Sequence, residues 1–101
     1  MKIERFEDIQ AWQEARKLTN RVFDITEEKS ISRRYRFTSQ IESASVSIMN
    51  NIAEGFSRRS NKEFVQFLFI SKGSAAEVQS MFADKTARLI SNFIKYLRKS
   101  N

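Results

Sequence analysis

Hydrophobic residues recur along most of the chain at steps of three and four, the spacing that places them on one face of an α-helix. From Phe6 to about Glu28 this stripe consists of Ile9, Trp12, Ala15, Leu18, Val22 and Ile25. The acids Glu7 and Asp8 open the segment, where the helix dipole favours negative charge. The pattern predicts a first amphipathic helix over residues 6–28.

The period breaks over residues 26–32, and a second stripe follows, consisting of Phe37, Ile41, Ala44, Ile48 and Ile52. This second segment is rich in serine and alanine, so a neighbouring helix could approach it closely. Gly55 follows the stripe, and glycine is the residue type that best adopts the left-handed conformation of a helix C-cap. We therefore expect the second helix to end at Gly55.

A third helix is predicted to begin at Ser60-Asn61-Lys62-Glu63, because Ser-x-x-Glu has the form of a capping box. Its stripe consists of Phe64, Phe67, Leu68, Ser71, Ala75, Val78 and Phe82. Gly73 lies inside this helix, where glycine costs about 1 kcal/mol relative to alanine unless close packing requires it. The sequence therefore predicts a close helix contact at Gly73.

A fourth apolar segment follows without any turn residue to separate it from the third, and consists of Ala83, Ala87, Ile90, Phe93, Ile94 and Leu97. If the chain continues as one helix from Phe64 to Leu97, that helix is roughly 50 Å long at 1.5 Å per residue. Helices one and two could not cover it. Two alternatives follow: the helix is extended, or a hairpin is missing from this sequence.

The composition agrees with an all-α protein of a single domain over residues 1–101. There is no proline and only Gly55 and Gly73 among 101 residues, which leaves little turn chemistry for strands and hairpins. No cysteine and no histidine are present, so the common thiolate nucleophile, general base and metal ligands are missing. We expect no enzymatic activity, no cofactor and no metal site.

The N-terminus carries acids and has no apolar signal segment, and no apolar run approaches the roughly 20 residues of a membrane span. We therefore expect a soluble, cytoplasmic protein without a membrane partner. The net charge is +6, and the basic excess is uneven, because residues 31–101 hold twelve basic and five acidic side chains. Such asymmetry favours a polyanionic partner, although it also suits a merely solvated basic surface.

Two basic clusters are predicted at helix N-termini. Arg33, Arg34 and Arg36 precede or open the second helix, and Arg58, Arg59 and Lys62 surround the start of the third. Cations there oppose the helix dipole, whereas a phosphate would be favoured by the dipole, the free N–H groups and the arginines together. A bound phosphate would therefore relieve the conflict.

Several strings in the sequence resemble the four helix bundle protein family, first noticed as open reading frames in intervening sequences of bacterial 23S rRNA genes. They are Phe6-Glu7-Asp8-Ile9 with Trp12-Gln13, Asn51-Ile52-Ala53-Glu54-Gly55, Lys62-Glu63-Phe64, and Gly73-Ser74-Ala75-Ala76-Glu77. The resemblance implies an antiparallel up-down four-helix bundle, often assembled as a homo-pentamer. A related accessory protein of diversity-generating retroelements is basic and binds nucleic acid, which supports nucleic-acid binding at the level of the fold.

The chain departs from this family at Met81–Lys85, where relatives place an apolar stretch and a glycine-containing turn. From the resemblance we expect a loop to be missing or shortened near residues 82–85, with a separate antiparallel fourth helix after it. A turn there would bring Lys95, Arg98 and Lys99 beside the second basic cluster and make one basic pole. Without a turn, that surface is split and another subunit must complete the bundle.

Other residues in the matching strings have mainly structural interpretations. We expect Asn51, Glu54 and Glu77 to form a buried hydrogen-bond network between the second and third helices, with a functional polar site as the alternative. Trp12 lies on an apolar stripe, so we interpret it as a core or interface anchor rather than a base-stacking platform. Glu42 and Ser43 stand where relatives often carry basic residues, which weakens that face as a nucleic-acid surface.

The leading functional hypothesis is a non-enzymatic homo-oligomer that binds nucleic acid through phosphate contacts, with RNA favoured over DNA by the family's association. No motif for reading base edges is present. The alternative is a protein-interaction or assembly scaffold, which would be indicated if Phe23, Phe69 and Tyr96, which lie off the main stripes, were exposed. A binder of anionic membranes is disfavoured, because the basic clusters are predicted at helix ends.

Overall fold

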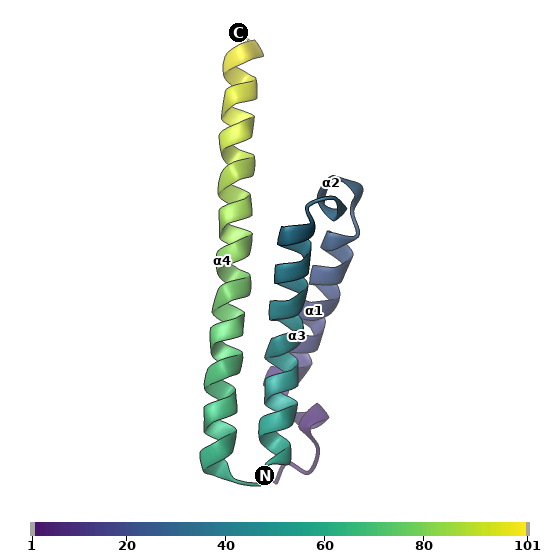
Figure 1. Cartoon of the computed structure of the whole chain (residues 1–101), viewed down its shortest axis with the longest axis vertical. Coiled ribbons are helices and arrows are strands. Elements are labelled where there is room, and N and C mark those ends of the chain that lie inside the picture. The colour runs from purple at the N-terminus through teal and green to yellow at the C-terminus, as the bar shows by residue number, and fades with distance from the viewer. Residues whose placement is uncertain (1, 101) are drawn as a thin grey trace.

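The computed structural model describes residues 2–100, and every regular element in that range is a helix (Figure 1). The elements are η1 (Phe6–Asp8), α1 (Gln10–Thr26), α2 (Lys29–Ser32), α3 (Tyr35–Ser57) and α4 (Asn61–Ser100). The all-α class and the antiparallel packing of successive long helices are confirmed, and they are consistent with an up-down bundle. The single-turn helix α2 lies within the segment where the hydrophobic period breaks.

Helix α3 lies between the other two long helices. Both α1 and α4 pack against α3, and in the described part of the chain α1 and α4 make no close backbone approach to each other (Figure 1). The buried core residues come from all three helices: Ala15 and Val22 from α1, Ile41, Ala44, Ile48 and Ile52 from α3, and Val78 from α4. The first three stripes predicted from the sequence thus contribute to one shared core, and the fourth does not.

The expected turn at residues 82–85 is wrong, because α4 runs as one helix of 40 residues from Asn61 to Ser100. Its C-terminal part extends past α2 and α3, and no other described element lies beside it (Figure 1). The physical reason is local: residues 74–91 contain no glycine, proline or asparagine, and most are good helix formers. The molecule is consequently elongated, with extents of 62 × 25 × 22 Å.

The apolar stripe of α4 does not keep one direction along the helix. The side chains that lie against the body are Phe64, Phe67, Ser71, Ser74, Val78, Met81, Phe82 and Lys85, all buried or partly buried. At 3.6 residues per turn, Ala87, Ile90 and Ile94 fall on the opposite side of the helix. The predicted continuous periodicity from Phe64 to Leu97 therefore consists of two stripes on opposite sides.

The two glycines have roles different from those predicted. Gly55 does not end α3, which continues to Ser57; it is buried inside the helix, and a Cβ there would lie 2.6 Å from the Cβ of Phe67. Glycine is required at this position for the close approach of α3 and α4. The left-handed residue of the connection is Arg59, at φ 60°. The expected close contact at Gly73 is absent, because nothing lies within 4 Å of a Cβ built there.

The predicted start of the third helix is confirmed. Helix α4 begins at Asn61, and the backbone N–H of Glu63 donates a hydrogen bond of 3.3 Å to Ser60 Oγ. This is the serine half of the capping box. Because only Arg58, Arg59 and Ser60 separate α3 from α4, the two helices must run antiparallel and side by side.

Candidate nucleic-acid interface

The basic residues singled out from the sequence fall at three separate places. Arg33 and Arg34 join α2 to α3, and Arg36 lies in the first turn of α3. Arg58 and Arg59 join α3 to α4 at the opposite end of the body, followed by Lys62 in the first turn of α4. The third place is the free end of α4, which carries Lys95, Arg98 and Lys99.

The predicted single basic pole is wrong for one chain. Because α4 does not turn, Lys62 and Lys95 are about 50 Å apart along the helix at 1.5 Å per residue. The C-terminal cations therefore cannot join Arg58 and Arg59 within one subunit. This is the split surface that an uninterrupted helix implies.

Two cations that the sequence analysis did not single out, Lys85 and Arg88 of α4, lie beside the start of α3 instead. An open cleft of about 540 Å³ lies between the two helices there. Its lining consists of Arg34, Tyr35, Arg36, Phe37, Gln40, Met81, Asp84 and Arg88. We name Arg34, Arg36, Lys85 and Arg88 the α3–α4 basic cluster. Arg34 and Lys85 lie at nearly equal distances along the sequence from the short α3–α4 connection, so two antiparallel helices bring them side by side. The sequence therefore contained a signal for this pair.

Lys85 is the electrostatic centre of the α3–α4 basic cluster. Its Nζ lies 5.3 Å from the centre of the Phe37 ring, a cation–π contact. Burial lowers the pKa of Lys85, and the charges of Arg34 and Arg88 lower it further, while Glu28 acts in the opposite direction. The cluster thus holds a partly desolvated cation among like charges, and a bound anion would relieve both effects.

In the cluster of Arg58, Arg59 and Lys62 at the α3–α4 connection, Arg58 already has partners within the chain. Arg58 Nη2 lies 2.9 Å from Glu54 Oε1, and the guanidinium group of Arg58 lies 5.1 Å from the centre of the Phe67 ring. Among the described residues this is the only ion pair that involves a candidate cation from either cluster. Arg59 and Lys62 are exposed. Phosphate contacts at this end would therefore depend mainly on Arg59 and Lys62.

The expected polar network between α3 and α4 exists with different members. Asn51 Nδ2 donates to the carbonyl oxygen of Ser47 at 2.8 Å and to Ser47 Oγ at 3.0 Å. Ser74 Oγ donates to Ser47 Oγ at 3.0 Å, which links α4 to α3. Asn51 belongs to this network, whereas Glu54 and Glu77 are exposed on the surface and lie outside it. Two serines replace the expected carboxylates.

Two further serine and threonine contacts hold the helices together inside the core. Ser71 Oγ of α4 donates to the carbonyl oxygen of Ile48 at 2.8 Å. Thr19 Oγ1 of α1 donates to the carbonyl oxygen of Ser45 at 3.2 Å. No buried polar side-chain atom in the described residues lacks a partner. Because satisfied polar groups restrict the relative positions of helices, these contacts favour one packing of α3 on α1 and α4.

Trp12 packs as an anchor at the N-terminal end of the body. Its ring is partly buried against the core and meets Phe6 edge to face, with ring centres 5.2 Å apart. The guanidinium group of Arg16 lies 5.7 Å from the Trp12 ring centre. These contacts agree with the core interpretation of Trp12.

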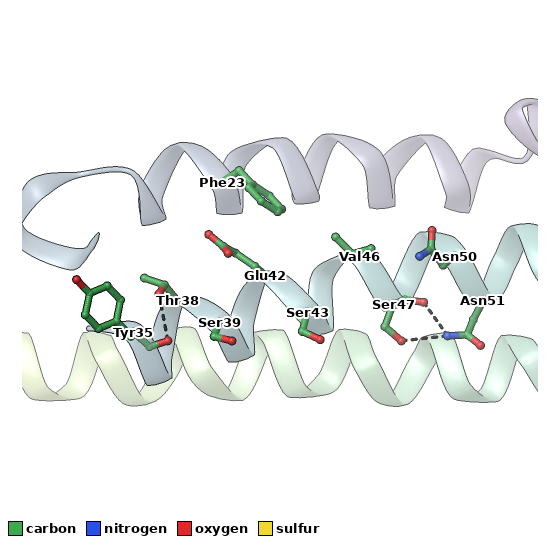
Figure 2. A pocket seen from close by; sticks show the side chains of 10 residues that line it. All are labelled: Phe23, Tyr35, Thr38, Ser39, Glu42, Ser43, Val46, Ser47, Asn50 and Asn51. Atoms are coloured by element: carbon green, nitrogen blue, oxygen red, sulfur yellow. Dashed lines mark hydrogen bonds between the residues drawn. The ribbon is translucent and has the colours of Figure 1, made fainter. Parts of the chain in front are cut away.

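Another open cleft runs along α3 on the side shown in Figure 2, where Phe23 of α1 faces a row of α3 side chains. Its lining is mostly polar and contains no lysine or arginine. Glu42, its one ionisable acid, accepts a hydrogen bond of 2.6 Å from Thr26 Oγ1. This side of α3 therefore offers nothing that would neutralise a phosphate.

In the described residues, no group of three or more His, Cys, Asp or Glu side chains could hold a metal ion. Within the same range, no helix combines the length and apolar character needed to cross a membrane.

Comparison with known proteins gives one match. The family model described as "23S rRNA-intervening sequence protein" matches residues 7–99. No curated protein matches the sequence, and no solved structure matches it either.

Proposed function

Since this chain belongs to the 23S rRNA-intervening sequence protein family, we propose that it is a non-enzymatic homo-oligomer that binds nucleic acid, RNA in preference to DNA. The observation that supports this proposal most is the α3–α4 basic cluster. It places three arginines on the lining of one open cleft, and a partly desolvated lysine, Lys85, lies next to Asp84 of that lining in the sequence. Among the described residues, none of these four cations has an ion-pair partner within 4 Å.

The chemistry of this cluster suits a phosphate better than a carboxylate surface. Arginine forks bind two phosphate oxygens at once, and Arg34 is the N-cap residue of α3, where free N–H groups favour an anion. A phosphate near Lys85 would also counter the repulsion from Arg34 and Arg88. Contacts of this kind position a backbone without reading base sequence.

The second candidate function is a protein-interaction or assembly scaffold. Phe69 and Tyr96 of α4 are 67% and 64% exposed, and Phe23 of α1 is 36% exposed. Contiguous exposed apolar patches mark interaction surfaces, whereas single exposed residues do not, so this function requires these side chains to belong to such a patch. The homo-pentamer implied by the resemblance remains a prediction that a mass measurement in solution tests.

The test of nucleic-acid binding is a titration of a structured RNA, and of a duplex DNA of equal length, across a salt series. We expect affinity to fall steeply with salt, and the Arg34→Ala/Arg88→Ala variant to bind all sequences more weakly. Its salt slope should fall by about one unit for each phosphate contact removed. The Arg58→Ala/Arg59→Ala variant measures the second cluster in the same way.

The matched control is Lys17→Ala/Arg21→Ala, which removes the same charge from exposed positions of α1. If all three variants lose the same affinity, net charge alone explains the binding, and the cluster has no special role. Binding that does not respond to salt, or that persists unchanged in the first variant, would contradict phosphate contacts at the cluster. Stronger binding to DNA than to RNA would contradict the proposed preference.

A further inference from the structure

The cleft between α3 and α4 that carries the α3–α4 basic cluster contains more than cations. Two of its lining residues, Phe37 and Met81, are apolar and pack partly buried against the core. Three others are the phenol ring of Tyr35, the amide of Gln40 and the carboxylate of Asp84. A surface that only holds a phosphate backbone needs neither an apolar lining nor a carboxylate. The cleft therefore fits a ligand that has other groups besides its phosphate.

Tyr35 is the most exposed large hydrophobic side chain in the described part of the chain, at 76%. It is the first residue of α3, and Figure 2 shows its ring projecting from the start of that helix, apart from the other labelled side chains. Among the described residues its ring contacts no other aromatic ring and its hydroxyl makes no hydrogen bond. An aromatic ring of this kind, set at a basic cleft, offers a face on which a nucleic-acid base can stack.

The antiparallel course of α3 and α4 orders the cleft from one end to the other. Lys85 lies over the Phe37 ring, so Arg88, about one turn further along α4, stands beside the first turn of α3. About one turn in the other direction, Met81 stands beside Gln40, nearer the middle of the body. A nucleotide whose phosphate lies at the arginine end would therefore have its base along the apolar and amide lining.

Asp84 is an acid on the lining of this basic cleft. Among the described residues it has no ion-pair partner within 4 Å, although three arginines line the same cleft. Its charge opposes a phosphate, so it would weaken a ligand that offered only oxygen atoms. It favours a ligand that also donates N–H groups, because an ionised carboxylate only accepts hydrogen bonds. The amino group of cytosine is a donor that aspartate accepts from in nucleic-acid recognition.

A fully paired duplex would leave much of this lining without a contact. Its bases are stacked on one another, and it offers mainly phosphates and sugars to a surface of this kind. An unpaired nucleotide presents a phosphate, the face of a ring and the polar edge of a base together. The cleft has a volume of about 540 Å³, within the range of about 300–1,000 Å³ for sites that take small ligands.

We propose that this cleft holds one unpaired nucleotide of an RNA strand, with its phosphate on the arginines, its base stacked on Tyr35 and an amino group of the base on Asp84. This inference rests on the proposed function and makes its ligand specific, namely single-stranded rather than paired segments. The phosphate contacts supply the dependence on salt, whereas the base contacts supply the choice between unpaired and paired nucleotides.

The first experiment measures binding of the full chain to a short RNA strand without self-complementarity, and to the duplex of that strand with its complement. We expect the single strand to bind more tightly. The Tyr35→Ala variant should lose about 5- to 150-fold in affinity for the strand, the range for one stacked base. Its salt slope should stay that of the wild-type chain, because no phosphate contact is removed.

Two further variants serve as controls for Tyr35→Ala. Tyr35→Phe keeps the ring and should bind the strand nearly as tightly as the wild-type chain. Phe69→Ala removes an exposed ring of α4 that lies outside the cleft, and it should leave binding unchanged. Circular dichroism checks that helix content is the same in all three. If Tyr35→Ala keeps its affinity for the strand, or loses affinity equally for the duplex, stacking at the cleft is overturned.

The second experiment compares oligocytidylate with oligouridylate of equal length, because their bases carry an amino group and a carbonyl oxygen at the same ring position. We expect the wild-type chain to prefer oligocytidylate by about 2- to 10-fold, the contribution of one hydrogen bond. Asp84→Ala should remove this preference and raise the affinity for oligouridylate, since a negative charge leaves the cleft.

Glu77→Ala is the matched control, because Glu77 is an exposed acid of the same helix outside the cleft. It should retain the preference for oligocytidylate. Equal binding of the two strands by the wild-type chain, or a preference that persists in Asp84→Ala, would overturn the contact between Asp84 and the base.

A free nucleotide has the same chemistry as one nucleotide of a strand, so cytidine monophosphate provides a third arm. We expect it to bind much more weakly than oligocytidylate, because only a strand adds phosphates beyond the cleft. Equal affinity would assign the cleft to free nucleotides and overturn its assignment to a strand.

These outcomes are separable from those of the proposed function. Equal binding of strand and duplex, with both weakened in Arg34→Ala/Arg88→Ala, would retain phosphate contacts at the cluster and overturn the unpaired nucleotide. Failure of the wild-type chain to bind any of these RNAs would remove the proposed function, and this inference with it.

Discussion

The two parts of α4 are both rich in apolar residues but lie in different environments. Residues 61–85 pack against α3, and Val78 there is only 2% exposed. Residues 89–100 continue the same helix past the start of α3, with no other described element beside them, and Phe93 is 60% exposed. The comparison shows that an apolar stripe predicts a packed surface but does not say whether the partner lies in the same chain.

The difference follows from where α3 begins. Leu89, Phe93 and Tyr96 continue on the side of α4 that faces α3 in the packed part, whereas Ile90 and Ile94 lie on the opposite side. Both sets are exposed, because α3 begins at Tyr35 and does not extend beside them. The projecting part is therefore stable as a helix by continuity with the packed part, and its apolar side chains remain available for a partner.

The largest expected difference between the two parts concerns matched Ile→Ala substitutions. Ile48 of α3 is 6% exposed and faces the packed part, so Ile48→Ala should lower the free energy of unfolding by about 2–5 kcal/mol. Ile90→Ala, measured at concentrations too low for association, should change it by less than about 0.5 kcal/mol. Urea denaturation checks both values. Equal losses would mean that the C-terminal part is packed within the chain.

Replacing each glycine by alanine should change the free energy of unfolding by an intermediate amount, with opposite signs at the two positions. Gly55→Ala should destabilise by about 1–3 kcal/mol, because the added Cβ would lie 2.6 Å from Phe67 Cβ and 2.9 Å from Phe64 Cδ1. Gly73→Ala should stabilise by up to about 1 kcal/mol, since alanine favours the helix and nothing lies within 4 Å. Thermal unfolding followed by circular dichroism measures both. A destabilising Gly73→Ala would place another helix against this position.

The smallest expected effect concerns Lys85, at the boundary of the two parts. Its pKa is lowered in the folded chain, first by burial and then by Arg34. Between the folded pKa and the unfolded one, the unfolded chain binds more protons, so stability rises with pH through that window. Lys85→Met should remove this rise and should stabilise at neutral pH by on the order of 0.5 kcal/mol. Urea denaturation of the wild-type chain and of Lys85→Met at pH 8 and pH 10.5 measures the free energy of unfolding of both.

If the pH dependence of the variant matches that of the wild-type chain, Lys85 does not experience the repulsion described for the α3–α4 basic cluster. The unfolding free energies at both pH values serve as the internal control. In the wild-type chain, added polyanion should reduce the rise, because it would restore the pKa of Lys85 toward its ordinary value.

Most of the fold could be predicted from the sequence, and the candidate site only in part. The stripes of α1 and α3 and the Ser60 cap identified three helices, because periodicity and capping are local properties of a few neighbouring residues. Arg34 and Arg36 were singled out, but Lys85 and Arg88 were not. Lys85 and Arg88 lie beside α3 only because α4 continues as a helix well past the connection. No local sequence motif indicates how far that helix continues.

The sequence alone determined the helical class, the residues of each stripe, the start of α4 and the family. Only the tertiary structure decided that α4 does not turn, that Gly55 serves close packing and that the basic residues divide among separate ends. The reason is physical: helix formation is set by neighbours along the chain, whereas the direction of a helix after a boundary depends on contacts between distant segments. For α4, the described contacts with α3 end near Arg88, and the apolar side chains beyond it are exposed.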